Sequence, residues 1–180
     1  MIGTAVRSVN SMATLRAIDT SNIADSFLVL LAGFASANDG GGGIFVWRAT
    51  STANNDGGTV VRPNSIPPAD PGRWLRDYAG AINVRWFGAG LGAADDAPLI
   101  QRAVETAIHI GFPGNNSFGG TVYLPAGNYN VRQAIYIETS DENYRGWISV
   151  RITGDGKFNT HIRLTGASSI AGQSVFTNNF

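Results

Sequence analysis

The sequence predicts a mainly β protein in which a small antiparallel β module precedes one helix and a series of stacked strands. The chain has 23 glycines among 180 residues, and this share disfavours a helical bundle and favours strands joined by tight turns. The segment between Asp95 and Gly111 carries the one convincing helical pattern. After residue 120, short segments alternate apolar and polar residues with a period of two, which is typical of strands.

The charge composition excludes one class of partner. Lys and Arg together number 13, Asp and Glu also number 13, and the formal net charge is zero. A nucleic-acid-binding domain would be basic, so we expect no nucleic-acid partner. Charged residues make up 14% of the chain, against roughly 25% in ordinary domains, and this predicts a surface that other subunits partly cover.

Cysteine content and hydropathy set further bounds. The chain has no cysteine, which excludes a disulfide scaffold, a thiolate zinc site and a cysteine nucleophile. The longest apolar run, residues 27–35, is far shorter than the ~20 residues of a membrane-spanning helix. Residues 1–10 lack the apolar core of a secretory signal. We therefore expect no membrane partner, and we interpret the apolar run as a buried strand.

The first part of the chain reads as a compact antiparallel module. Residues 1–26 are polar and mixed, with a short helix predicted around residues 11–18. The four consecutive glycines at 40–43 reach positive φ angles freely and predict a hairpin or bulged turn. Prolines between residues 63 and 72 exclude a strand there. The predicted strands are residues 27–35, 44–47, 59–62, 73–76 and 81–87.

A glycine-rich segment at residues 88–94 is interpreted as a linker, which predicts one domain at residues 1–87 and a second at residues 95–180. Gly88 to Ala93 also fits the G-x-G-x-x-A fingerprint of dinucleotide-binding sites. A βαβ unit would have to follow that fingerprint, and the sequence shows none. We therefore predict no cofactor at this segment.

The predicted helix opens at two aspartates. Asp96 is the expected N-cap, with its carboxylate accepting an N–H group of the first turn, and Pro98 lies within that turn. Both Asp95 and Asp96 lie at the positive end of the helix dipole. Gly111 is expected to end the helix. One apolar stripe predicts that a single face packs on a core; it consists of Leu99, Ile100, Ala103, Val104, Ala107 and Ile108.

The strands after the helix follow one another in series, each closed by a glycine or asparagine turn. This pattern favours the coils of a β-solenoid, although the spacing gives no clean repeat. The predicted strands are residues 121–124, 128–131, 134–137, 147–153 and 160–164.

Three segments of the second part resemble the entry into the right-handed parallel β-helix of the pectate-lyase-like superfamily. They are Phe-Gly-Ala at 87–89 with the helix opening at Asp95, Gly-Gly-Thr-Val-Tyr-Leu-Pro-Ala-Gly-Asn-Tyr at 119–129, and Ile-Thr-Gly-Asp-Gly at 152–156. The resemblance spans roughly residues 87–165. It implies that the helix caps the bottom of the solenoid and that the glycine-rich segment forms the first coil. It implies no reaction, because the superfamily includes lyases, hydrolases and inert spikes.

Residues 12–87 resemble the small β module that precedes the β-helix in bacteriophage tail spikes and tail fibres. The resemblance rests on Asn-Asp-Gly-Gly-Gly-Gly-Ile-Phe-Val-Trp at 38–47, Gly-Arg-Trp-Leu-Arg at 72–76 and Val-Arg-Trp-Phe-Gly at 84–88. Tail spikes often have Gly-Asp-Gly before the helix, where this chain has Gly-Leu-Gly-Ala-Ala at 90–94. This departure puts the linker geometry in doubt.

The resemblance implies a virion tail spike or fibre component, and hence a part that serves host attachment. Such spikes are typically homotrimers whose N-terminal module docks on a tail or baseplate protein. Their distal β-helix binds, and often cleaves, host surface polysaccharide. In this chain the docking surface is expected within residues 1–40, the segment with the least internal pattern.

An open solenoid end exposes strand edges, so we expect the chain to be the N-terminal portion of a longer one or to have its end covered by partners. Two alternatives stay open. One is a complete polysaccharide lyase or glycoside hydrolase of the β-helix class, and the other is a capsid decoration protein that contacts no sugar. A polysaccharide-clearing activity of the chain alone would favour the first alternative.

We assign no catalytic, cofactor-binding or metal-ligating residue. A glycosidase would need a pair of carboxylates, for which the sequence offers Glu138, Asp141, Glu142 and Asp155. A lyase would need cations, for which it offers Arg132, Arg145, Arg151 and Arg163. We interpret these groups as solvated turn residues and ion-pair partners. His109 and His161 lack metal-ligand spacing, and core or interface packing is the expected role of Trp47, Trp74, Trp86 and Trp147.

Overall fold

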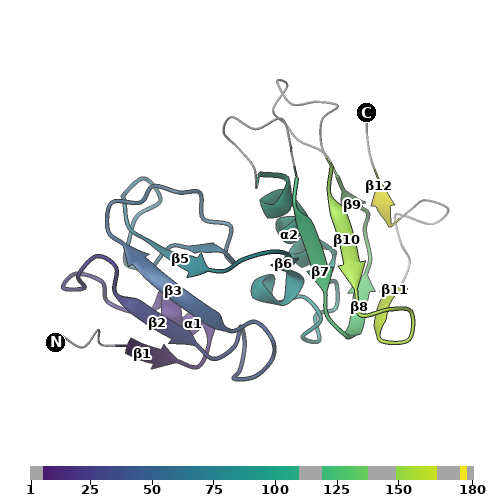
Figure 1. The fold of residues 1–180 in the computed structure, drawn as a ribbon, viewed down its shortest axis with the longest axis horizontal. Coiled ribbons are helices and arrows are strands. Elements are labelled where there is room, and N and C mark those ends of the chain that lie inside the picture. Colours follow the sequence, from purple (N-terminus) through teal and green to yellow (C-terminus); the bar gives the residue numbers. More distant parts are fainter. Residues whose placement is uncertain (1–5, 110–118, 138–148, 166–174, 178–180) are drawn as a thin grey trace. The chain divides into compact units, whose positions relative to one another are not determined.

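The computed structural model describes residues 6–109, 119–137, 149–165 and 175–177. The chain divides into two compact units, Met1–Ala79 and Gly80–Phe180. Both units consist mainly of strands, which confirms the predicted fold class (Figure 1). No helix within the described ranges is long and apolar enough to cross a membrane.

The first unit is built on a five-stranded sheet with the order β1-β2-β3-β5-β4 (Figure 1). β2, β3, β5 and β4 pair antiparallel, as the sequence predicts, whereas β1 pairs parallel with β2. The helix α1 begins after Ser11, whose side-chain oxygen accepts a hydrogen bond from the Thr14 N–H group. The elements are β1 (Val6–Val9), α1 (Met12–Arg16), β2 (Leu28–Leu31), β3 (Gly43–Arg48), β4 (Val60–Val61) and β5 (Arg73–Asp77).

The parallel edge strand β1 was not predicted from the sequence. Its sequence, Val-Arg-Ser-Val, does not alternate apolar and polar residues, and of the four only Val9 is buried. A parallel pair also needs a crossover connection, and the chain between β1 and β2 supplies one that contains α1. The antiparallel module predicted for residues 27–87 therefore carries one further strand at this edge, and that strand is parallel.

The core of the first unit forms between one face of the sheet and α1. Two tryptophans on neighbouring strands, Trp47 and Trp74, pack with ring centroids 5.0 Å apart. Both are buried, which confirms the predicted packing role of these two side chains. The buried residues of this core are Val9, Met12, Leu15, Ile18, Val29, Leu31, Phe45, Trp47, Val61 and Trp74.

Asp39 organises the turn between β2 and β3. Its two carboxylate oxygens accept hydrogen bonds from the backbone N–H groups of Phe34 (2.9 Å), Ala35 (2.8 Å), Ser36 (3.0 Å) and Gly41 (2.8 Å). Burial opposes ionisation of this carboxyl group, but the four donors together lower its pKa below the ordinary value of 3.8. The turn is therefore held in place by the ionised form of Asp39.

This arrangement predicts a pH-dependent contribution to stability. A carboxyl group whose pKa is lowered by folding stabilises the fold above its unfolded pKa, and the stabilisation is lost as the pH falls through the folded pKa. We expect Asp39→Asn to lower the free energy of unfolding by about 2 kcal/mol at about pH 7 and by much less at about pH 2. Urea unfolding of both proteins at the two pH values measures this difference, and an equal loss at both would contradict the role of the charge.

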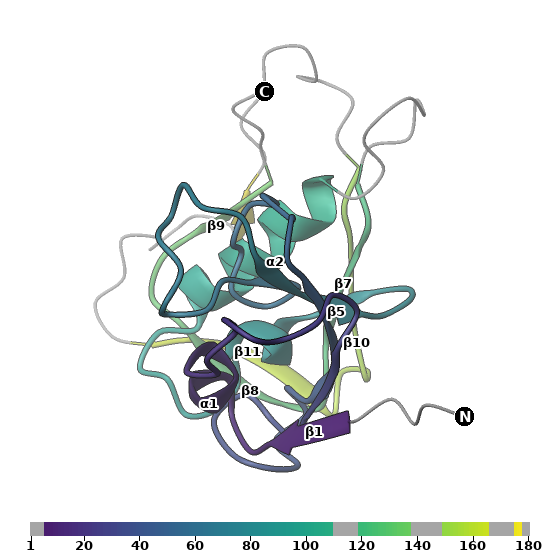
Figure 2. The same ribbon diagram turned by 90° about the vertical axis from the view of Figure 1, so that its left-hand side faces the viewer.

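The second unit consists of strands stacked in parallel around a helix. β7 pairs with β10, β8 with β11 and β9 with β12, so two successive coils lie on one another (Figure 1 and Figure 2). β6 extends the first stack beside β7. The elements are β6 (Ile82–Asn83), a 3₁₀ helix η1 (Val84–Phe87), α2 (Ala97–His109), β7 (Thr121–Leu124), β8 (Gly127–Val131), β9 (Ile135–Tyr136), β10 (Arg151–Gly154), β11 (Thr160–Leu164) and β12 (Phe176–Thr177).

Residues 81–87 do not form the predicted last strand of the first module. Ile82–Asn83 pairs with β7 of the second unit, and Val84–Phe87 turns into the 3₁₀ helix. The Asn83 side chain accepts a hydrogen bond from the Arg85 N–H group at 2.9 Å and starts that helix. The division of the chain therefore falls after Ala79, before these residues.

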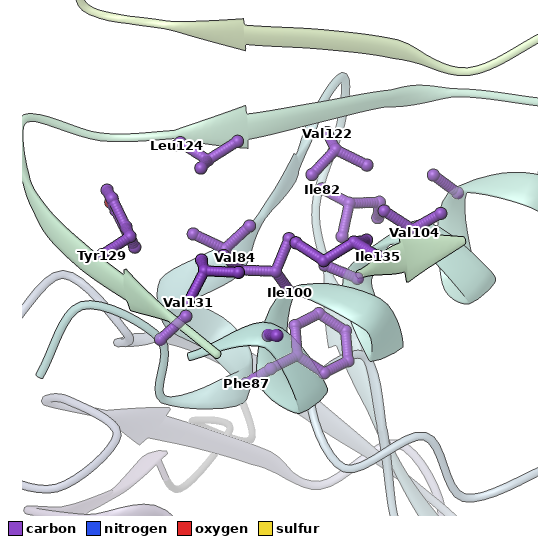
Figure 3. Close-up of a cluster of buried hydrophobic side chains, with 14 of the residues drawn as sticks. Ile82, Val84, Phe87, Ile100, Val104, Val122, Leu124, Tyr129, Val131 and Ile135 are labelled. Carbon is purple, nitrogen blue, oxygen red and sulfur yellow. The ribbon is translucent and has the colours of Figure 1, made fainter. Parts of the chain in front are cut away.

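The helix α2 packs against the first coil and contributes one side of the core of the second unit. Figure 3 shows Ile100 and Val104 among side chains of β6, β7, β8 and β9. Five of the six residues in the predicted stripe are buried, and Leu99 is partly buried against the same cluster. This confirms that one face of the helix packs on the first coil. The predicted end of the helix at Gly111 lies outside the described residues.

The strands of the second coil pair in register with those of the first, but their apolar side chains are more exposed. Ile162 lies beside Tyr129 and Leu164 beside Val131 in the pairing of β11 with β8. Tyr129 and Val131 are buried, whereas Ile162 and Leu164 are exposed. The buried core of the solenoid thus lies between α2 and the first coil.

The segment at residues 88–94 lies within the second unit and begins with two buried residues, so the linker interpretation was wrong. Gly88 ends η1 with a positive φ of 91°, and Ala89 is fully buried. The Gly90 N–H group donates to the Asp96 carboxylate at 2.8 Å. A Cβ at Gly90 would lie 2.6 Å from Cε1 of Tyr129, so the backbone approaches this ring too closely for any side chain.

We expect Gly90→Ala to lower the free energy of unfolding by about 3 kcal/mol, because it adds a steric clash to an unfavourable φ. Gly92→Ala is the matched control, since Gly92 also has a positive φ but a Cβ there meets nothing within 4 Å. It should cost only about 1 kcal/mol. Thermal or urea unfolding compares the two variants, and equal losses would contradict the tight contact with Tyr129.

Candidate functional site

The outer face of the five-stranded sheet carries a row of aliphatic side chains. Adjacent strands place Val6, Leu28, Val46, Leu75 and Val60 in one register line across all five strands. Successive residues of a strand point to opposite faces. The row therefore lies on the face opposite to the one that Val29, Phe45 and Trp74 bury in the core.

Two further aliphatic residues widen this row into a surface. Leu30 of β2 and Ile44 of β3 are register partners, with exposed fractions of 46% and 44%. Val6 at the sheet edge is 61% exposed, and the other four residues of the row are half-buried. We call Val6, Leu28, Leu30, Ile44, Val46, Val60 and Leu75 the apolar outer face. Contiguous exposed apolar surface of this kind is typical of a protein-interaction site.

The apolar outer face overlaps only partly with the docking segment expected at residues 1–40. Val6, Leu28 and Leu30 belong to that segment, whereas Ile44, Val46, Val60 and Leu75 come from later strands. The sequence could not show this grouping, because it depends on which strands pair. The sequence did offer one signal for this face, the alternation in β3. Ile44 and Val46 precede and follow the buried Phe45, so their side chains lie on the other face of the strand.

The carboxylate of Asp155 is used in joining the two coils. Its oxygens accept hydrogen bonds from the Tyr123 hydroxyl and the Ala126 N–H group, both at 2.7 Å. The hydrogen bond to Asp155 raises the pKa of Tyr123. The Asp155 N–H group donates to Oγ1 of Thr160, which in turn donates to the Leu124 carbonyl group. Asp155 therefore fixes the turn before β11 onto the turn after β7.

The other predicted acid and cation candidates do not come together in the described residues. Glu138, Asp141, Glu142 and Arg145 lie outside them. Arg132 donates its backbone N–H group to Asp95. Arg151 and Arg163 are exposed and lie on different strands, β10 and β11. The described part of the chain thus shows no carboxylate pair next to an arginine cluster.

The two histidines form local contacts with backbone carbonyl groups. Nδ1 of His109 lies 2.6 Å from the Glu105 carbonyl oxygen, and Nε2 of His161 lies 3.2 Å from that of Phe158. Within the described ranges, no three residues of the types His, Cys, Asp and Glu are grouped so as to hold a metal ion. Trp86 packs partly buried against the core of the second unit, and Trp147 lies outside the described residues.

A family model decides the relationship of the second unit. The model of rhamnogalacturonase A/epimerase, described as pectate lyase-like, matches residues 81–180, more than half of the chain. The chain belongs to this pectate-lyase-like family. A second model, of the small four-stranded β-sheet domain of phage tail proteins, matches residues 8–79. The two matched ranges agree with the two units of this pectate-lyase-like protein.

Solved structures with a similar fold include phage tailspikes. The pectate-lyase-like chain is 22% identical to the tailspike protein of Acinetobacter phage vB_ApiP_P1, with a TM-score of 0.69 over 98% of this chain and 26% of that one. It is 21% identical to tailspike gp49 of the Acinetobacter baumannii bacteriophage Fri1, described as a capsular polysaccharide depolymerase, with a TM-score of 0.59 over 82% and 23%. The chain thus spans about a quarter of each of these structures.

The chain also shares a short stretch of sequence with an enzyme that is not described as a phage protein. The mannuronan C5-epimerase AlgE3 of Azotobacter vinelandii is 52% identical over 54 residues, which are 29% of this chain and 3% of the epimerase. A shared stretch this short carries no activity from one protein to the other. At the level of family and fold, the findings confirm the predicted pectate-lyase-like β-helix, and the second model agrees with the predicted phage tail β module before it.

Proposed function

We propose that this chain is the N-terminal region of a phage tail spike whose first unit docks on another protein of the tail. The observation that carries the proposal is the order of the two units: a domain of the phage tail family leads directly into a pectate-lyase-like β-helix. The same observation supports the virion tail as the location of the chain.

The apolar outer face is the proposed docking surface, and a tail or baseplate protein is its occupant. The family match of this unit to a phage tail domain supports that choice of partner. The charged groups beside this face lie at strand ends: Arg48 ends β3, where it pairs with Asp25, and Asp77 ends β5. An apolar surface bordered by polar groups is the usual anatomy of a protein interface.

The second unit begins the part of the spike that we propose contacts host surface polysaccharide, in a homotrimer. The similar fold of tailspikes, one of them described as a depolymerase, supports this proposal. Catalysis by this chain itself gains no support from the described residues, since Asp155 serves to join the coils. The alternative of a complete lyase or hydrolase therefore ranks second.

Sedimentation with purified tails that lack their spike tests the docking proposal. The chain is expected to sediment with the tails, and the double variant Leu30→Asp with Ile44→Asp is expected to bind at least tenfold more weakly, because two charges enter an apolar contact. Phe158→Asp is the matched control, since Phe158 is a highly exposed apolar residue of the second unit. It should leave tail binding unchanged.

Two results would contradict the docking proposal. One is the absence of binding by the unmodified chain. The other is a double variant that binds tails normally but no longer forms trimers in light scattering, since the apolar outer face would then join copies of the chain.

A further inference from the structure

A cavity of about 350 Å³ opens in the first unit between the loop that follows β3 and the proline-rich loop before β5. Two arginines contribute to its wall, and the remaining lining groups are neutral. The lining residues are Thr52, Ala53, Asn54, Asn55, Arg62, Pro68 and Arg73. No Asp or Glu lines the cavity, so its charge is positive.

Arg73 forms the buried side of the cavity. Its side chain is 4% exposed and donates hydrogen bonds to the carbonyl groups of Ala53 (3.0 Å), Asp70 (2.9 Å), Gly72 (2.8 Å) and Pro68 (3.3 Å). These acceptors are neutral, and the one ion pair found in the described part of the chain joins Arg48 to Asp25 instead. The charge of Arg73 is thus balanced by backbone dipoles alone.

Arg62 lines the same cavity, and its side chain carries a donor without a partner. Its Nη1 atom is buried and has no hydrogen-bond partner. Its backbone N–H group donates to Oδ1 of Asn55 at 3.0 Å, which leaves the amide Nδ2 of Asn55 as a further donor. The nearby carboxylate of Asp56 is engaged by its own turn, through the N–H groups of Gly58, Thr59 and Val60.

A buried guanidinium nitrogen without an acceptor is costly, and an oxyanion supplies the charged acceptor that it needs. We propose that the Arg62 cavity is a binding site for a small oxyanion group, a carboxylate or a phosphate. In this proposal the Arg62 guanidinium and the Asn55 amide donate hydrogen bonds to the oxyanion. The buried Arg73 adds positive charge to the cavity wall. This site is separate from the apolar outer face and does not depend on the docking proposal.

Titration of the 180-residue chain with sodium acetate, sodium glucuronate or potassium phosphate tests the site. Amide shifts in NMR spectra are followed at constant ionic strength against sodium chloride. Saturable shifts of residues 52–55 and 62 are expected with at least one probe, and Arg62→Gln should weaken binding at least tenfold. Arg48→Gln, at an exposed arginine outside the cavity, should leave the affinity unchanged. Saturation by acetate and glucuronate alone identifies a carboxylate site, and saturation by phosphate alone a phosphate site.

Asn55→Asp provides a second test that does not require removing an arginine. The variant keeps the acceptor for the Arg62 N–H group and places a carboxylate inside the cavity. It is expected to abolish binding of all three probes and to raise the melting temperature in chloride buffer. Shifts that stay linear with every probe, or saturable binding that survives in both Arg62→Gln and Asn55→Asp, would overturn the proposal.

Discussion

Arg76→Met is expected to lower the free energy of unfolding of the first unit by about 4 kcal/mol, because it leaves buried carbonyl groups without donors. The Arg76 side chain, 6% exposed, donates to the carbonyl groups of Gly58 (2.9 Å), Gly42 (2.6 Å) and Gly41 (3.0 Å). Its guanidinium also lies 4.6 Å from the centre of the Phe45 ring. One side chain thus joins the glycine-rich turn before β3 to the loop before β4.

The positive charge of Arg76 persists in this buried place. Desolvation lowers its pKa to about 10, which keeps the guanidinium protonated at neutral pH. Lysine cannot replace the planar fork that reaches carbonyl groups on two loops. Arg76→Lys is therefore expected to recover only part of the lost stability.

Urea unfolding followed by tryptophan fluorescence measures the effect, since Trp47 and Trp74 report on the core of this unit. Arg48→Met is the matched control: Arg48 is an exposed arginine of the same sheet that pairs with Asp25 at 3.2 Å. Exposed ion pairs contribute about 0–1 kcal/mol, so the control should be close to the unmodified protein. A loss at Arg76 no larger than at Arg48 would contradict the bridging role.

Asp96→Ala is expected to destabilise the second unit by about 3–4 kcal/mol, because two backbone N–H groups lose a charged acceptor. Asp96 is 1% exposed. Its oxygens accept hydrogen bonds from the N–H groups of Gly90 and Asn130, both at 2.8 Å, and its own N–H group donates to the Asn130 carbonyl group at 2.6 Å. It therefore joins the segment before α2 to β8 of the first coil.

Asp96 precedes the helix as predicted, but the prediction that its carboxylate accepts an N–H group of the first turn was wrong. The Asp96 carbonyl group accepts the first helical bonds, from the N–H groups of Leu99 and Ile100. The carboxylate that accepts from a helix N–H group belongs to Asp95, which receives the Ala97 N–H group at 3.0 Å. The Asp95 carboxylate thus caps the helix, and the Asp96 carboxylate instead binds the N–H groups of Gly90 and Asn130.

Equilibrium unfolding of the full chain, followed by circular dichroism, tests the role of Asp96. Glu105→Gln is the control, because Glu105 is an exposed acid of α2 and the substitution removes the same charge. It is expected to change stability by less than about 0.5 kcal/mol. If Asp96→Asn proved as stable as the unmodified protein, one neutral oxygen would suffice, and the need for two acceptors would be refuted.

Several features of this protein could be predicted from the sequence because they depend on neighbouring residues. The apolar stripe of α2 follows from helical spacing, and its burial follows from that stripe. The alternation in β7 and β8 likewise predicts Val122, Leu124, Tyr129 and Val131 on the inner face, where the structure buries them. Local periodicity is enough for these elements, since each one carries its own apolar face.

The features that remained hidden join residues far apart in the chain. β1 became a strand only because β2 lies beside it, and Ile82–Asn83 was assigned to the wrong unit because its partner is β7. The apolar outer face requires the register of all five strands, and the Arg62 cavity requires two loops to meet. Asp96 and Arg76 read as an ordinary helix cap and an ordinary strand residue. Their actual partners are backbone groups, which every residue has, so no sequence pattern could single them out before the chain had folded.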